Sequence, residues 1–395
     1  MRPSIIEQLV VSVAKRLIPK AIKGQLDLTL PSGRVFTLGG NVAGEQADLT
    51  IRNFKVLWTS LRRAQLGFFE SYLAGDIESK NPTAIFRFYL QNRKGLDRAS
   101  GLFTASVIDK IWHRLRDNST EGSKENISAH YDLGNDFYRQ WLDDTMTYSS
   151  AVFDGNSNSL EAAQKLKYQK VMNAAEVKAG SRVLEIGCGW GGFAETAAKA
   201  GAVLRGISLS KEQLAFANDR MKREKLEQKA ELVFEDYRDT KGEFDAIASV
   251  EMIEAVGEAH WPEYFKMVFN RLKPGGAAAI QGITILEENY SAYRSGVDFI
   301  QRYIFPGGML LTKELMLQQT QKAGLLLEKF DCFGLSYAET LRQWRLRFEA
   351  AWPKIAPLGF DERFRKLWTL YLCYCEAGFA EGVIDVGIYK IRKPV

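Results

Sequence analysis

The sequence predicts an α/β protein in which a doubly wound parallel sheet follows a smaller N-terminal α+β domain. Three observations support this prediction. From about residue 180, short β runs alternate with helical segments, as in sheets whose strands are joined by crossover helices. These runs are nearly all apolar, as strands covered on both faces require. With 395 residues, the chain is long enough for two domains.

The first third of the chain predicts the small α+β domain. Residues 4–23 have apolar side chains at helical spacing and basic residues towards the end, which indicates an amphipathic helix. The pattern then predicts a β-hairpin over residues 26–30 and 34–38, a strand over 48–52, and helices over 51–72 and 82–92. Residues 117–126 have the polar composition of a linker. We therefore predict one domain over residues 1–117 and a second over residues 118–395.

The second domain shows the regular series of elements. The β runs cover residues 182–186, 202–207, 230–234, 244–249 and 277–285, and helices are predicted over 192–200 and 211–227. Because the carboxyl ends of parallel strands share one edge, ligands are expected there.

The positive charge is concentrated in the first third of the chain. The whole sequence has 53 Lys and Arg against 48 Asp and Glu, a formal net charge of +5. Residues 1–130 hold 19 of the basic and 12 of the acidic residues, a balance of +7, so the remainder carries −2. This asymmetry indicates an anionic partner for the first third, either nucleic acid or a lipid surface. The alternative is a basic surface that is merely solvated.

Composition and spacing exclude several classes of protein. No apolar run reaches the roughly 18 residues of a membrane-spanning helix, and the first residues lack the continuous apolar core of a signal peptide. Four cysteines in so long a chain form no disulfide framework, which favours a reducing, cytoplasmic compartment. The histidines, His113, His130 and His260, are too few and too scattered to predict a metal site.

The strongest local motif is a glycine-rich loop between a strand and a helix. Residues 183–192 read VLEIGCGWGG, and Gly187, Gly189 and Gly191 allow a ligand to approach the backbone. The loop formally fits a dinucleotide motif, but Ser208 ends the next β run, where such folds use an acid for the ribose. Glu185, two residues before the first glycine, suits a cationic ligand. S-adenosylmethionine, with its sulfonium and ammonium groups, therefore fits the loop better than NAD.

Several motifs together resemble a known family. Residues 187–192, 210–213 and 236–239 read GCGWGG, SKEQ and DYRD; residues 126–138 and 146–151 read NISAHYDLGNDFY and MTYSSA; residues 303–308 and 337–341 read YIFPGG and YAETL. These motifs resemble the S-adenosylmethionine-dependent methyltransferases, and more narrowly the cyclopropane-fatty-acyl-phospholipid synthases and mycolic acid cyclopropane synthases. The resemblance implies a Rossmann-like methyltransferase sheet. It is strong from about residue 125 to the C-terminus and loose before it.

The resemblance implies which residues hold the cofactor. Tyr148, Ser149 and Gly187 would hold its methionine end. Ser208, Leu209 and Gln213 would meet the ribose side, and Asp236 and Tyr237 would flank the adenine.

The reaction itself requires negative charge and a base. Methyl transfer from a sulfonium to a carbon–carbon double bond leaves a carbocation, which must be stabilised and must then lose a proton. Residues 249–257 read SVEMIEAVG and place acids at the carboxyl edge of the sheet. In the resembling synthases the base is thought to be a bicarbonate ion, held by a Cys, a Glu, a His, an Ile backbone and a Tyr. By motif, the matching residues here are Ser150, Glu254, Gln281, Ile283 and Tyr337.

Two of these positions depart from the family. Ser150 stands where Cys is usual, and Gln281 stands where His is usual. Both can bind an anion through hydrogen bonds, but neither has the charge or proton capacity of an imidazole. Methyl transfer is therefore better supported than ring closure, and a methyl-branched or methylene-bearing chain is an alternative product.

A long acyl chain also requires an apolar pocket. Candidate residues follow the last β run or recur at helical spacing near the C-terminus: Phe299, Ile300, Tyr303, Ile304 and Phe305, then Phe364, Leu367, Trp368, Tyr371 and Cys375. Such stripes are more often part of the core than of a ligand pocket.

The favoured hypothesis is an enzyme that adds a one-carbon unit to an unsaturated fatty acyl chain of a phospholipid. This enzyme would be cytoplasmic and peripherally associated with the inner face of an anionic membrane. A homodimer is one oligomeric state that we consider for it. The alternatives are an amine N-methyltransferase and a non-catalytic lipid- or nucleic-acid-binding protein. Because no nucleic-acid-binding module is recognisable, a nucleic-acid partner is not expected.

Overall fold

A computed structural model of the chain describes residues 7–8, 11–12, 22–99, 133–155 and 159–395. The predicted linker at residues 117–126, the boundary after residue 117 and most of the helix predicted over residues 4–23 lie outside the described residues. So does the first half of the motif at residues 126–138.

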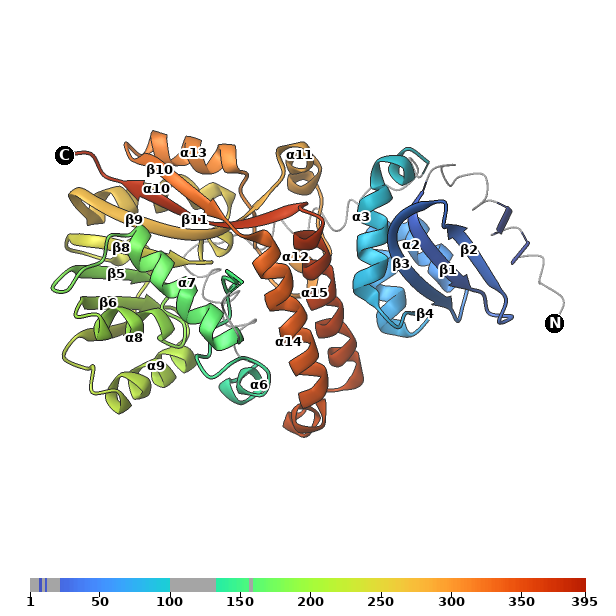
Figure 1. Cartoon of the computed structure of the whole chain (residues 1–395), viewed down its shortest axis with the longest axis horizontal. Helices are drawn as coiled ribbons and strands as arrows, with labels where there is room; N and C mark the ends of the chain where they lie inside the picture. Colours follow the sequence, from blue (N-terminus) through green and yellow to red (C-terminus); the bar gives the residue numbers. More distant parts are fainter. Residues whose placement is uncertain (1–6, 9–10, 13–21, 100–132, 156–158) are drawn as a thin grey trace.

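The N-terminal domain contains a four-stranded sheet covered by two helices (Figure 1). The strand order is β2-β1-β3-β4, and the elements are β1 (Lys23–Thr29), β2 (Val35–Gly39), β3 (Val42–Ile51), α2 (Lys55–Ala74), β4 (Ile77–Glu78) and α3 (Pro82–Ala99). The predicted hairpin is the antiparallel β1–β2 pair. Its turn is closed by Gly33, whose φ of +84° is in the region that favours glycine and whose N–H donates to the carbonyl of Leu30 at 2.8 Å.

The second domain is built on a seven-stranded sheet, which confirms the predicted doubly wound fold. Its strand order is β10-β11-β9-β8-β5-β6-β7, with β5 (Arg182–Ile186), β6 (Val203–Ser208), β7 (Ala230–Phe234), β8 (Phe244–Val250), β9 (Leu272–Ile285), β10 (Leu326–Cys332) and β11 (Ile384–Arg392). Strands β5 to β9 are parallel, and β11 is antiparallel to both of its neighbours. The sequence prediction included neither β10 nor β11. Strand β10 was missed because it is a largely exposed edge strand without an apolar run, whereas β11 is mostly buried.

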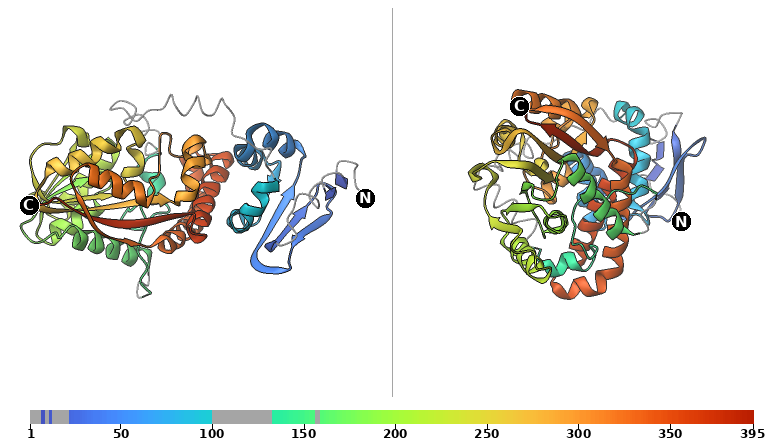
Figure 2. Two further views of the ribbon diagram at one scale, coloured as in Figure 1. Left: turned by 90° about the horizontal axis from the view of Figure 1, so that it is seen from above. Right: turned by 60° about the vertical axis from the view of Figure 1, so that its left-hand side comes forward.

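Helices cover both faces of this sheet (Figures 1 and 2). One face carries α7 (Leu160–Ala174), α8 (Gly192–Lys199) and α9 (Lys211–Arg223), whose apolar side chains form one core cluster with the strands. The other face carries α10 (Trp261–Arg271) and α13 (Lys313–Lys322), around a second core cluster. The predicted helices at 192–200 and 211–227 correspond to α8 and α9.

Two long helices stand between the sheet and the N-terminal domain (Figure 1). These are α14 (Gly334–Ile355) and α15 (Glu362–Ala380), and α3 of the N-terminal domain packs on α15. Arg87 of α3 donates to Glu381 at 2.7 Å, and Tyr303 donates to Glu70 of α2 at 2.7 Å. The short elements are α6 (Asn135–Arg139), α11 (Glu287–Ser295), α12 (Phe299–Tyr303) and the 3₁₀ helices η1 (Tyr237–Asp239), η2 (Ile253–Ala255), η3 (Glu258–His260) and η4 (Ala356–Leu358).

Within the described ranges, no helix has the length and apolar character needed to cross a membrane.

Candidate active site

One pocket of about 340 Å³ lies at the carboxyl ends of β5, β6 and β8 and collects most of the residues predicted for the site. Its lining includes Tyr148, Ser149, Glu185, Gly187, Gly189, Ser208, Leu209, Gln213, Tyr237, Glu254, Ile283 and Tyr337. These residues come from seven separate stretches of the sequence. Most follow parallel strands, whose carboxyl ends meet at one edge of the sheet, whereas Tyr148 and Ser149 precede α7 and Tyr337 lies on α14.

Four predicted residues lie beside the pocket rather than in its lining. Gly191 starts α8, where an added Cβ would meet Ala217 at 3.1 Å. Asp236 is buried, and both of its oxygens are held by Arg238, at 2.9 Å and 3.1 Å. Ser150 and Gln281 are fully buried behind the lining, where they contact one of its carboxylates, described below.

The glycine loop leaves open space for a ligand at Gly189. This residue has a φ of +50°, and no atom lies within 4 Å of the position that a Cβ would take. The loop is held against β6 because the N–H groups of Gly187 and Cys188 both donate to the carbonyl of Ile207 at 3.0 Å. The backbone at Gly189 is therefore accessible from the pocket, as the close approach of a cofactor requires.

Glu185 places an acid at the end of β5, next to this loop. Its side chain is buried, and its Oε2 has no hydrogen-bond partner among the described residues. Burial raises the pKa of this carboxyl to about 8, although Lys167 and Arg220 act in the opposite direction. A buried acid with a free oxygen can pair with a cationic ligand, which fits S-adenosylmethionine.

The ribose-side residues are arranged by the start of α9. The Ser210 side chain caps this helix and accepts a hydrogen bond from the N–H of Gln213 at 3.3 Å. This cap fixes the first turn of α9, from which Gln213 contributes to the pocket lining. Ser208 ends β6, and its Oγ accepts from the N–H of Ser210 at 3.1 Å. Across from them, the buried hydroxyl of Tyr237 has no partner in the part of the chain that the structure describes.

A second carboxylate, Glu251, was not singled out by the sequence analysis. It directly follows β8 and lines the pocket, with its backbone at a φ of +52°. Its Oε1 accepts from the N–H of Ser150 and from Nε2 of Gln281, both at 2.8 Å, and its Oε2 accepts from the hydroxyl of Tyr337 at 2.7 Å. Ser150 thus contributes its main chain, while its own hydroxyl donates to the carbonyl of Ala151 at 2.9 Å.

Glu254 lies close to Glu251 at the same edge of the sheet. Its Oε1 accepts from the N–H of Ile283 at 2.5 Å, and its buried Oε2 has no partner among the described residues. Burial, and next the charge of Glu251, raises the pKa of Glu254 to about 8. Two neighbouring carboxyls in a poorly solvated site cannot both ionise freely, so Glu254 is the one that holds a proton near neutral pH.

A buried lysine lies behind these acids and was also missed. Lys167 of α7 is completely buried, donates to Oγ of Ser149 at 2.6 Å, and has its ammonium 4.2 Å from the ring centre of Tyr168. Burial lowers the pKa of Lys167 to about 7, while the charges of Glu251, Asp143 and Glu185 raise it. The sequence offers one signal for this burial: Lys167 lies at helical spacing among the apolar residues of α7.

The far half of the pocket is mainly apolar and aromatic, with Asp298 and Gln301 as polar members of its lining. Among the residues predicted for an acyl pocket, Ile300, Phe305, Tyr371 and Cys375 belong to its lining, and Phe379 and Ile384 extend it. Phe299, Ile304 and Trp368 are instead buried in the aromatic core. The N-terminal domain contributes Leu90 of α3 to the same lining.

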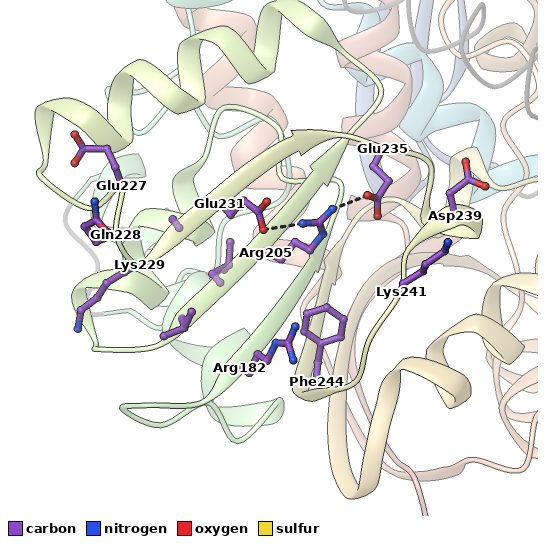
Figure 3. Close-up of a pocket in the computed structure, with 13 residues that line it drawn as sticks. Arg182, Arg205, Glu227, Gln228, Lys229, Glu231, Glu235, Asp239, Lys241 and Phe244 are labelled. Atoms are coloured by element: carbon purple, nitrogen blue, oxygen red, sulfur yellow. Dashed lines mark hydrogen bonds and ion pairs between the residues drawn. The ribbon is translucent and has the colours of Figure 1, made fainter.

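A second hollow, of about 630 Å³, lies at the β6–β7 edge and is lined mainly by charged side chains (Figure 3). Arg205 at its centre is paired with Glu231 and Glu235, both at 2.6 Å. The charged lining does not suit an apolar acyl chain, and the Arg205 guanidinium, already paired with two carboxylates, does not suit a free anion.

Comparison with known proteins agrees with this geometry. The family model described as mycolic acid cyclopropane synthetase matches residues 118–389. The chain is 40% identical over 333 residues to a tuberculostearic acid methyltransferase of Mycobacterium tuberculosis, covering 82% of this chain and 78% of that protein. It is 33% identical over 336 residues to the cyclopropane-fatty-acyl-phospholipid synthase of Escherichia coli, covering 84% of each. The crystal structure of the mycolic acid cyclopropane synthase CmaA1, complexed with SAH and CTAB, superposes with a TM-score of 0.65 at 26% identity, over 68% of this chain and 98% of that one.

Proposed function

Because the chain belongs to the mycolic acid cyclopropane synthetase family, we propose that it transfers a one-carbon unit from S-adenosylmethionine to the double bond of an unsaturated fatty acyl chain of a phospholipid. The observation that carries this proposal is one continuous pocket whose two halves differ in polarity. One half contains the glycine loop and Glu185, the other is apolar, and buried acids and aromatic rings lie at the junction.

The junction suits the charge that this reaction develops. When bound, S-adenosylmethionine supplies an electrophilic methyl group. The double bond contributes the electron pair of the new carbon–carbon bond, which leaves a positive charge on the neighbouring carbon of the acyl chain. The rings of Tyr148, Phe305 and Tyr371 belong to the pocket lining. An aromatic face next to a cation stabilises it by about 0.5–2 kcal/mol, so these rings are suited to such a charge.

The cofactor residues predicted from the motifs are retained in this proposal. Tyr148, Ser149 and Gly187 would hold the methionine end, and Ser208, Leu209 and Gln213 the ribose, all from the pocket lining. Tyr237 is favoured over Asp236 on the adenine side, because the Asp236 carboxylate is already engaged by Arg238.

The proposal is tested with purified protein, methyl-labelled S-adenosylmethionine and phospholipid vesicles. We expect label in the fatty acids of vesicles with unsaturated chains, as a gain of one CH₂ by mass spectrometry, and none with saturated chains. Label that appears in small amines, but not in acyl chains, would refute the proposal in favour of an amine methyltransferase.

We further propose that the protein works as a peripheral protein at the cytoplasmic face of an anionic membrane, which it approaches through its basic first third. In the described part of that region, Lys55, Trp58 and Arg62 lie on the exposed side of α2 at helical spacing, and Trp58 is 69% exposed. Tryptophan flanked by basic residues is the combination that prefers the headgroup region of a bilayer.

Cosedimentation with vesicles tests this surface. We expect Trp58→Ala to lower the bound fraction several-fold on anionic vesicles. The matched control is Leu335→Ala, which removes an apolar side chain that is 73% exposed on α14. Equal losses in both variants would contradict a specific role of α2.

A further inference from the structure

The anion cradle of this site is already occupied by the protein itself. The resemblance to the synthases implies a bicarbonate ion held by groups at Ser150, Glu254, Gln281, Ile283 and Tyr337. In this chain the Ser150 N–H, the Gln281 amide and the Tyr337 hydroxyl all donate to Glu251. The remaining donor, the Ile283 N–H, is taken by Glu254. The residues present therefore do not fit a separate bicarbonate, because every donor of the cradle is bound to a carboxylate of the chain.

We propose that Glu251 takes the place of the free anion and is the base that removes a proton from the methylated acyl chain. This inference rests on the proposed function and adds to it a residue that the family motifs do not mark. It also explains why Ser150 and Gln281 depart from the family pattern, since they hold a side chain that is attached to the sheet rather than a diffusible ion.

The geometry leaves Glu251 able to accept a proton. A carboxylate has about four acceptor sites on its two oxygens. Oε1 of Glu251 uses two of them, for Ser150 and Gln281, whereas Oε2 uses one, for Tyr337. One acceptor site on Oε2 thus remains, on a residue that lines the pocket at its junction.

The backbone at Glu251 is held in an unfavourable conformation. Its φ of +52° is in the left-handed region, which costs a non-glycine residue about 1–2 kcal/mol. The Glu251 N–H donates to the carbonyl of Gln281 at 2.8 Å, so β9 holds the turn in this form. Such strain is commonly retained where a side chain must be aimed precisely at a functional site.

The hydrogen bonds of the cradle favour ionisation of Glu251 over ionisation of Glu254, because three donors point at Glu251. Burial raises the pKa of Glu251, and its three hydrogen-bond donors and the charge of Lys167 oppose this rise. Glu254 accepts a hydrogen bond from the Ile283 N–H, and burial together with the Glu251 charge raises the pKa of Glu254 to about 8.

The step is balanced without a further reactant. After methyl transfer, a C–H bond of the new methyl group breaks, and the proton passes to Oε2 of Glu251. The electron pair of that bond can close a carbon–carbon bond to the cationic carbon, which gives a cyclopropane. If a 1,2-hydride shift first moves the positive charge to the carbon that bears the new methyl group, the same electron pair instead forms a C=CH₂ methylene branch. A saturated methyl branch would require a later reduction by a separate hydride donor.

Bicarbonate dependence tests the proposal. We expect the wild-type protein to be fully active in sealed, bicarbonate-free buffer and indifferent to added bicarbonate. Glu251→Gln keeps the cradle filled but removes the base, so turnover should fall about 10²–10⁴-fold and bicarbonate should not restore it. Glu251→Gly empties the cradle, suits the positive φ, and should recover activity at least tenfold with bicarbonate, but not with nitrate as the control anion.

The outcomes separate this inference from the proposed function. A wild-type protein that forms no one-carbon product from unsaturated phospholipids would defeat the proposed function. An active wild-type protein that needs bicarbonate, or a Glu251→Gln variant with unchanged turnover, would overturn the role of Glu251. So would a Glu251→Gly variant that binds S-adenosylmethionine normally and stays inactive with bicarbonate.

Discussion

At the scale of single residues, the absence of a side chain at Gly189 is a condition for binding the cofactor. We expect Gly189→Val to weaken S-adenosylmethionine binding at least tenfold, because its methyl groups would enter the open space beside the loop and its φ of +50° strains a β-branched residue. Isothermal titration calorimetry measures the affinity. Gly180→Val is the matched control: Gly180 has a φ of +82° and an equally open Cβ position, but it is not part of the pocket lining. Equal affinity losses in both variants would point to a general effect of backbone strain.

Glu254 illustrates how a buried carboxyl in the pocket changes the stability of the protein with pH. Its pKa is about 8 in the folded protein and near 4.5 in the unfolded chain. Between these values the folded protein binds more protons, so the wild-type free energy of unfolding falls as the pH rises. Because glutamine does not titrate, Glu254→Gln removes this loss of stability at higher pH. We expect the variant to be more stable than the wild type at pH about 8 and equal to it near pH about 4.5. Because Glu254 already holds a proton near neutral pH, its neutral amide isostere should leave turnover there within about tenfold of the wild type.

Denaturant unfolding at several pH values, together with the vesicle assay, measures both quantities for Glu254→Gln. The exposed Glu227→Gln, outside the pocket, is the control and should change neither quantity. A pH-independent stability difference would show that the carboxyl of Glu254 does not titrate in this range.

At the scale of elements, α7 carries a buried charge towards the site. Lys167 has a pKa of about 7 when folded, against 10.5 as its reference value, so the unfolded chain binds the proton more tightly between these values. The wild-type stability contributed by this group therefore rises with pH in that window. Below pH about 7, we expect the free energy of unfolding of Lys167→Met to be higher than that of the wild type by on the order of a few kcal/mol. Denaturant unfolding at several pH values should show this difference shrinking towards pH about 10.

Helix α3 of the N-terminal domain forms part of the pocket wall. We expect Leu90→Trp to narrow the apolar half, and to lower kcat/KM for long acyl chains about tenfold, without changing S-adenosylmethionine affinity. Tyr89→Trp is the neighbouring control, because Tyr89 is 42% exposed and outside the lining. If kcat/KM were unchanged in Leu90→Trp, the acyl chain would not reach this helix.

At the scale of the whole molecule, the charge asymmetry should govern association with membranes. Each basic residue near an anionic surface contributes about 1 kcal/mol, and salt screens the attraction. We expect the fraction bound to anionic vesicles to fall steeply between about 50 and about 500 mM salt. Binding to neutral vesicles that persists at high salt would show that charge is not the attraction.

The two domains act as one structure because the pocket depends on contacts between them. Arg87 of α3 pairs with Glu381, and Tyr303 bonds to Glu70 of α2, next to the apolar half of the pocket. The sequence analysis assigned the first domain to the lipid surface and did not anticipate a wall of the pocket, because Leu90 is one apolar residue among many on its helix.

The sequence by itself determined the strand–loop–helix unit around Gly187 and Gly189, the series of parallel strands from β5 to β9, and the concentration of basic charge in the first third. These features are local, since a few neighbouring residues define each of them. Only the tertiary structure decided which acid is held in the cradle. Glu251 receives its hydrogen bonds from residues 101, 30 and 86 positions away along the chain. No local pattern distinguishes it from Glu254, because the difference between the two carboxyls is made by donors that the folded sheet brings together.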